Sequence, residues 1–165
     1  MGRMDFTETL SYDASPDAVF VMLCDKDFRE EVCKQSHAIR YQVEVTPAED
    51  SAKVVISRVM PADVPDFAKA LVGHEIEILQ TEHWQPPDSA RVRVAGLRME
   101  IPGKPGQLVG TVTLRPEGAG TTEIINGELK VKIPFLGGKL EAEIAKGLRE
   151  GIRLEGRVGA GWLSR

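Results

Sequence analysis

The C-terminal part of the chain constrains the fold most, because it predicts one long helix with a single apolar face. At about 100° per residue, one broad arc carries apolar side chains and glycines, and the opposite arc carries most of the charge. The apolar arc holds Leu140, Ile144, Gly147, Leu148, Gly151, Ile152, Leu154, Val158 and Trp162. The pattern therefore predicts a helix over residues 138–163 that lies on one surface.

Two glycines lie near the middle of this predicted apolar face, at Gly147 and Gly151. Each glycine costs about 1 kcal/mol in helix propensity relative to alanine, so a structural reason for it is expected. We expect the glycines to leave space between the helix and the surface beneath, and this predicts an apolar cavity. The alternative is a close approach of backbones that leaves no cavity.

The surface beneath the helix is predicted to be a sheet, because the preceding chain has an apolar period of two. The predicted strands cover residues 6–12, 38–46, 52–60, 74–85, 90–101, 106–115 and 121–133. Short turns join most of them, which favours an antiparallel meander. Two short helices are predicted after the first strand. One begins at Ser15 and Pro16, a helix cap followed by a first-turn proline, and the other covers residues 27–36.

Composition limits the class of protein. The 165 residues suit a single domain, residues 1–165, and 42% hydrophobic with 28% charged residues is typical of a soluble globular protein. The net charge of −4, with no basic block, argues against nucleic acid as a partner. No apolar run approaches the roughly 20 residues of a membrane span, and no signal pattern is present, so we expect a cytoplasmic protein. The cysteine and histidine spacings match no zinc motif, so we expect neither a metal nor a cofactor.

Three segments together resemble a known superfamily. They are residues 12–20 (YDASPDAVF), residues 81–84 (TEHW) and residues 131–141 (VKIPFLGGKLE). Their order is similar to that of the SRPBCC, or START-like, superfamily, which includes the major birch-pollen allergen, lipid-transfer START domains and polyketide aromatase/cyclases. The last segment resembles the polyketide cyclase/dehydrase-like bacterial branch. The resemblance implies an α+β helix-grip fold, in which a curved antiparallel sheet of about seven strands grips the C-terminal helix and encloses a pocket. It carries over no catalytic residue.

Polar side chains on otherwise apolar faces are the candidates for a binding site in such a pocket. Gln80 and Glu82 alternate with apolar residues on one strand face, Arg58 does so on another, and Glu155 lies within the apolar arc of the long helix. We predict that Arg58 and Glu82 face the same interior space, within reach of each other or of a shared ligand. Such residues either orient a ligand or act as acid and base, or they form a structural ion pair.

The predicted flap adds one more candidate. Residues 61–73 contain two prolines and break the strand pattern, which predicts a flap with about one helical turn. Phe67 in this flap either packs in the core or closes the mouth of the pocket. The complete predicted ligand-binding set is Arg58, Met60, Phe67, Gln80, Glu82, Trp84, Gly151 and Glu155.

Three functions are compatible with these features. The first is a carrier or sensor that binds a small hydrophobic ligand such as a lipid, polyketide or isoprenoid. The second is a cyclase or dehydratase that uses Glu82 or Glu155 as acid or base. The third is an interaction protein whose pocket is filled by its own side chains. The sequence contains no nucleotide-binding or nucleophile motif, so we favour the first function and assign no catalytic residue.

Overall fold

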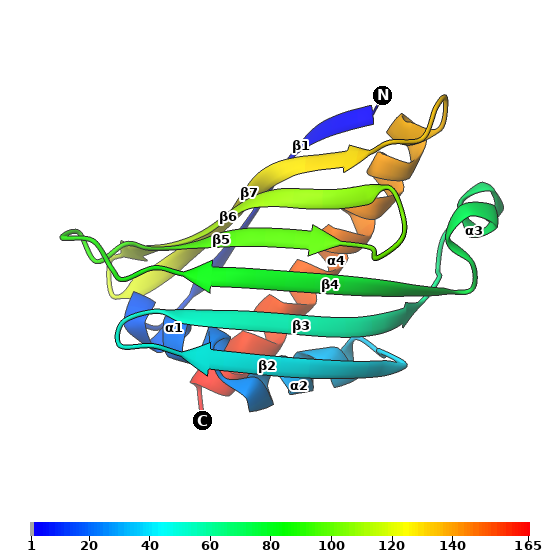
Figure 1. Cartoon of the computed structure of the whole chain (residues 1–165). Coiled ribbons are helices and arrows are strands. Elements are labelled where there is room, and N and C mark those ends of the chain that lie inside the picture. Colours follow the sequence, from blue (N-terminus) through cyan, green and yellow to red (C-terminus); the bar gives the residue numbers. More distant parts are fainter. Residues whose placement is uncertain (1) are drawn as a thin grey trace.

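The computed structural model describes residues 2–165, and the side chains of residues 3–165. Seven antiparallel strands form one open sheet in the order β1-β7-β6-β5-β4-β3-β2 (Figure 1). The strands are β1 (Gly2–Tyr12), β2 (Arg40–Pro47), β3 (Ala52–Pro61), β4 (Glu75–Trp84), β5 (Arg93–Glu100), β6 (Gly106–Glu117) and β7 (Gly120–Val131). The period-two pattern therefore predicted the strands correctly.

Four helices accompany the sheet: α1 (Pro16–Leu23), α2 (Lys26–Gln35), α3 (Asp66–Val72) and α4 (Gly137–Leu163). The Ser15 hydroxyl caps α1 by accepting a hydrogen bond from the Ala18 N–H at 3.2 Å, as the sequence predicted. α4 crosses one face of the sheet, and it contacts β1 and β7 (Figure 1). This arrangement is the helix-grip fold, which confirms the predicted α+β class.

The topology explains the two helices between β1 and β2. β1 and β2 form opposite edges of the sheet, so the connection between them must cross its whole width. α1 and α2 make this crossing on the same side as α4, and they contact it. α2 also covers β2, whereas α4 covers β1 and β7. The two ends of the concave face are therefore covered by different helices.

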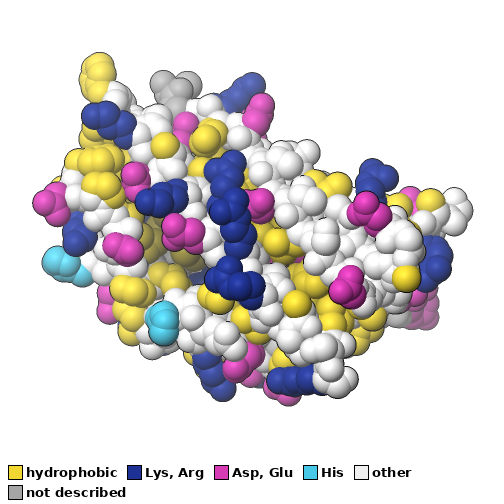
Figure 2. Space-filling view, turned by 180° about the vertical axis from the view of Figure 1, so that it is seen from behind, with side chains coloured by type: hydrophobic (Ala, Val, Ile, Leu, Met, Phe, Trp, Pro, Cys, Tyr) yellow, Lys and Arg dark blue, Asp and Glu magenta, His cyan; other side chains and the backbone are white. Residues whose placement is uncertain are grey.

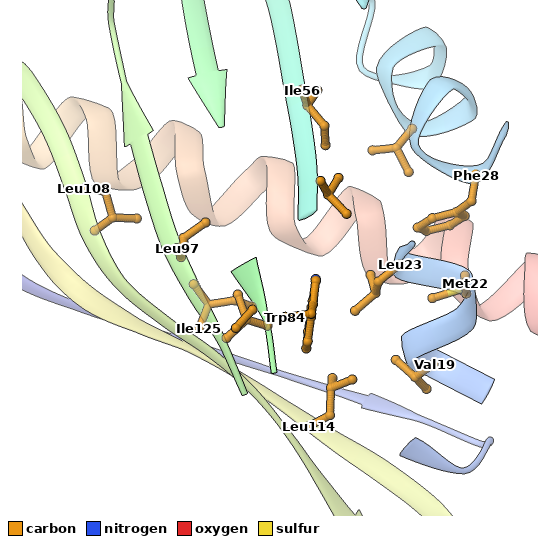
Figure 3. Close-up of a cluster of buried hydrophobic side chains, with 14 of the residues drawn as sticks. Val19, Met22, Leu23, Phe28, Ile56, Trp84, Leu97, Leu108, Leu114 and Ile125 are labelled. Atoms are coloured by element: carbon orange, nitrogen blue, oxygen red, sulfur yellow. The ribbon is translucent and has the colours of Figure 1, made fainter. Parts of the chain in front are cut away.

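The main hydrophobic core lies between the sheet and the helices α1, α2 and α4. Trp84 lies at its centre, 1% exposed, and side chains from α1, α2 and several strands converge on it (Figure 3). Its ring packs edge to face against Phe20, with ring centroids 5.6 Å apart. Phe28 makes a similar contact with Trp162 at 5.5 Å. Trp84 therefore belongs to the main hydrophobic core.

The prediction for Gly147 and Gly151 is wrong. Both glycines are exposed, and a Cβ atom on either would meet nothing within 4 Å. The glycines that face the sheet are Gly156 and Gly159; a Cβ on Gly159 would lie 2.8 Å from Cε1 of Tyr12. α4 therefore approaches the sheet closely at Gly156 and Gly159, and not at the two glycines for which the sequence predicted either a cavity or a close approach.

Candidate functional site

A buried arginine lies at the centre of a polar network that joins α2, β4 and α4. Arg29 is 2% exposed. Its Nε donates to the carbonyl oxygen of Leu23 at 2.6 Å, its Nη2 to Glu82 at 2.7 Å and its Nη1 to Glu155 at 2.8 Å. Burial alone would lower the pKa of Arg29, but the two carboxylates raise it, so the guanidinium stays charged.

Arg29 was not among the candidate residues identified from the sequence. A signal was nevertheless present. Arg29 precedes Val32 and Cys33 by three and four residues, and this spacing puts it on the buried face of a helix. Both of those residues are buried in the structure.

Residues of β4 extend the network along the concave face. Glu82 accepts hydrogen bonds from Nε1 of Trp84 at 2.9 Å and from Nε2 of Gln80 at 2.6 Å, in addition to that from Arg29. Gln80 in turn accepts from Nη2 of Arg58 on β3. Arg58 and Glu82 thus face the same interior space and are joined through Gln80. The direct cationic partner of Glu82 is Arg29 and not Arg58.

A second acidic position lies beside the network, on β7. Glu123 is 2% exposed and Tyr12 is 4% exposed, and neither Oε1 of Glu123 nor the Tyr12 hydroxyl has a hydrogen-bond partner among the described residues. Burial, reinforced by the negative charge of Glu155, raises the pKa of Glu123 to about 8. Burial also raises the pKa of Glu155, although Arg29 opposes this. Glu123 therefore carries a proton at neutral pH.

Away from the network, the concave face of the central strands is apolar and open. Met60, Ile76, Ile78, Met99 and Ile101 come from β3, β4 and the β5 end, and all are half-buried. No described helix contacts β3, β4 or β5 as closely as α4 contacts β1 and β7. We call these five residues the concave groove. From the helix side, hydrophobic side chains are visible in a hollow beside a row of basic residues (Figure 2).

A small apolar cavity of about 40 Å³ continues from the groove under α3. Ile76 and Ile101 of the groove line it, together with residues of α3, β7 and α4 that include Ala68, Val131, Leu140 and Ile144. At about 10–15 Å³ for each water, this volume holds only a few water molecules. An apolar cavity therefore lies between α4, the sheet and residues 61–73, as predicted, but it is small, and Gly147 and Gly151 do not line it.

The remaining predicted site residues lie in four different surroundings. Met60 lies in the concave groove, and the side chain of Glu155 is 16% exposed beside Arg29. Phe67 is 37% exposed on α3, where it does not cover the cavity as a lid would. Gly151 lies on the solvent side of α4. Among residues 3–165, no group of three or more histidine, cysteine, aspartate or glutamate side chains is arranged to hold a metal ion.

No helix within residues 2–165 is both long and apolar enough to span a membrane. The candidate site has an open apolar part, the concave groove, with Arg58 and Gln80 at its inner end. The tightly packed part is the network around Arg29. The two parts meet on β4, where every second residue, from Ile76 and Ile78 to Gln80 and Glu82, lies on the same face of the strand.

Solved structures share this fold at low sequence identity. The Zhui aromatase/cyclase from Streptomyces is 10% identical, with a TM-score of 0.66 over 99% of this chain and 95% of that chain. A STAR-related lipid transfer protein from Xanthomonas axonopodis is 10% identical, with a TM-score of 0.63 over 98% and 86%. TTHA0849 from Thermus thermophilus is 18% identical, with a TM-score of 0.63 over 97% of both chains. These likenesses confirm an SRPBCC-type fold.

Mycobacterial proteins are similar in sequence. The uncharacterized proteins Rv0481c of Mycobacterium tuberculosis and Mb0491c of Mycobacterium bovis are each 27% identical over 113 residues. The match covers 67% of this chain and 64% of each relative. A family model described as "Protein of unknown function (DUF2505)" matches residues 7–163. The chain therefore belongs to the DUF2505 family, within the SRPBCC-type fold.

Proposed function

We propose that the chain binds a small hydrophobic ligand in the concave groove and acts as a carrier or sensor. The observation that carries this proposal is the row of half-buried apolar side chains on β3, β4 and β5, which continues into the apolar cavity under α3. Burial of apolar surface is worth about 25 cal/mol per Å². An occupant that covers the groove would therefore be bound by the same effect that holds the core together.

The solved neighbours support the class of ligand. One is named as a lipid transfer protein and another as an aromatase/cyclase. The first name states a lipid as the ligand, and the second states a reaction that forms aromatic rings. For this chain we infer a lipid, a polyketide or an isoprenoid-like molecule, with its apolar body against Ile76 and Ile78 and one end under α3.

The state of the acidic residues favours binding over catalysis. A general acid or base must come within hydrogen-bond reach of its substrate. The Glu82 side chain is 3% exposed and already accepts three hydrogen bonds. Glu123 on β7 is also buried, at 2% exposed. Glu155 is occupied by Arg29. The network is therefore organised as a support for the groove.

Fluorescence of the neutral probe N-phenyl-1-naphthylamine, which rises in apolar surroundings, tests this proposal. We expect saturable binding to the wild-type chain and strongly reduced binding to Ile78→Glu, which puts a charge on the groove floor. Leu79→Glu is the matched control, since it makes the same change one residue away on the opposite face of β4. This control should bind the probe like the wild type.

Two results would overturn the proposal. One is the absence of saturable binding to a wild-type chain that unfolds cooperatively in urea. The other is equal loss of binding in Ile78→Glu and Leu79→Glu, which would mean that the probe senses loosened structure and not the groove. The first result would favour the alternative of an interaction protein that holds no ligand.

A further inference from the structure

Arg58 differs from the other inward-facing arginines because no described carboxylate pairs with it. Arg29 pairs with Glu82 and Glu155, and Arg93 pairs with Asp17 at 3.3 Å. Within residues 3–165, Arg58 makes no ion pair, and its one side-chain hydrogen bond goes from Nη2 to the neutral amide of Gln80. Its Nε is buried without a partner. A buried N–H donor without an acceptor is costly, and the charge of Arg58 has no carboxylate beside it among the described residues.

The position of Arg58 links this donor to the groove. Arg58 shares a face of β3 with Met60, and it pairs in register with Ile78 on β4. The guanidinium therefore lies where the apolar floor ends and the polar network begins. The partly exposed side chain of Arg58 lies on the same face of the sheet as Met60 and Ile78.

The network fixes the orientation of Arg58. Glu82, which Arg29 and Trp84 hold in place, accepts a hydrogen bond from Nε2 of Gln80 at 2.6 Å. The amide of Gln80 thereby turns its oxygen toward Arg58. The Glu82 charge is already used by Arg29, so the chain of contacts positions Arg58 and leaves its charge without a carboxylate.

We propose that the ligand of the concave groove is an amphipathic carboxylic acid whose carboxylate binds Arg58. This inference rests on the proposed function. The apolar chain of the acid lies along Ile78 and Ile76 toward α3, and the carboxylate accepts from the partly exposed guanidinium of Arg58. Arginine suits this role, because its planar donors match a carboxylate in a bidentate pair.

Competition between N-phenyl-1-naphthylamine and two ligands of equal chain length, decanoate and decanol, tests the proposal. The measured quantity is the preference for the acid: the half-displacing concentration of decanol divided by that of decanoate. We expect Arg58→Met to lower this preference about tenfold or more at pH 7, while decanol binds as before. Arg58→Lys, which keeps the charge, should retain most of it. Arg40→Met, at an exposed arginine on β2, should leave it unchanged.

A second measurement keeps the test independent of mutant folding. At pH 4 the carboxylate of decanoate is mostly protonated, so the wild type should lose its preference for the acid. A preference that survives in Arg58→Met, or equal losses of decanol and decanoate binding in that variant, would overturn the role of Arg58. Displacement of the probe by decanol with no preference for the acid would overturn the inference and leave the proposed function standing. No probe binding at all would overturn the proposed function.

Discussion

Replacement of Arg29 by methionine tests the buried network. The change removes the only cation among the described residues that contacts both Glu82 and Glu155 directly, and it leaves the carbonyl of Leu23 without its side-chain donor. Breaking a buried ion pair from one side costs about 3–5 kcal/mol. Because whole domains are stable by only about 5–15 kcal/mol, the variant should lose a large part of its free energy of unfolding, measured by urea denaturation at pH 7.

Two controls separate the buried network from a general effect of the substitution. Arg40→Met breaks an exposed pair with Glu75, whose side chains are 65% and 47% exposed, and should cost no more than about 1 kcal/mol. The double variant Arg29→Met plus Glu82→Gln should be less destabilised than the sum of its single changes, by about 2 kcal/mol. Lowering the pH to 5 should reduce the cost of Arg29→Met, since burial raises the pKa of Glu155 and Arg29 no longer opposes this in the variant. Equal costs for Arg29→Met and Arg40→Met, or strict additivity in the double variant, would refute the reasoning.

Two further predictions concern Glu123 and the glycines of α4. Glu123 keeps its proton up to about pH 8 in the folded chain but loses it near its ordinary pKa of 4.5 when unfolded. Folding stability should therefore fall as pH rises from about 4.5 to about 8, by up to about 5 kcal/mol from this group. Urea titrations should give a smaller fall for Glu123→Gln; an unchanged pH profile would contradict the assignment. Gly159→Ala should destabilise, because its Cβ would meet Tyr12 at 2.8 Å, whereas Gly151→Ala should stabilise by about 1 kcal/mol at its open position. Equal thermal shifts for the two variants would show that α4 is placed wrongly.

The elements of the fold could be predicted because each has a local signal. Period-two strands and the amphipathic helix follow from side-chain burial on one face, and Ser15 and Pro16 mark a helix start by their own chemistry. The helix-grip arrangement itself came from the resemblance of three segments to a superfamily. The order of the strands has no local signal, since β1 and β7 pair across most of the chain length.

The site was harder to predict than the fold, for two physical reasons. A glycine has no side chain, so its place on a helical wheel does not show which way the helix is rotated, and Gly147 and Gly151 were put on the wrong side. Charged residues are usually exposed, so Arg29 was passed over although its partners Glu82 and Glu155 were both identified as candidates. The alternation on β4 did identify Gln80 and Glu82 as inward-facing, because a strand's period admits only two faces.

The concave groove as a ligand site is the central claim, and methyl NMR tests it most directly. The isoleucine and methionine methyl groups would be observed while N-phenyl-1-naphthylamine is added, since its aromatic rings shift the resonances of nearby methyls. We predict saturable shifts at Met60, Ile76, Ile78 and Met99 and none at Ile39, which is 50% exposed outside the groove. Unchanged groove resonances, or shifts at Ile39 alone, would contradict the account.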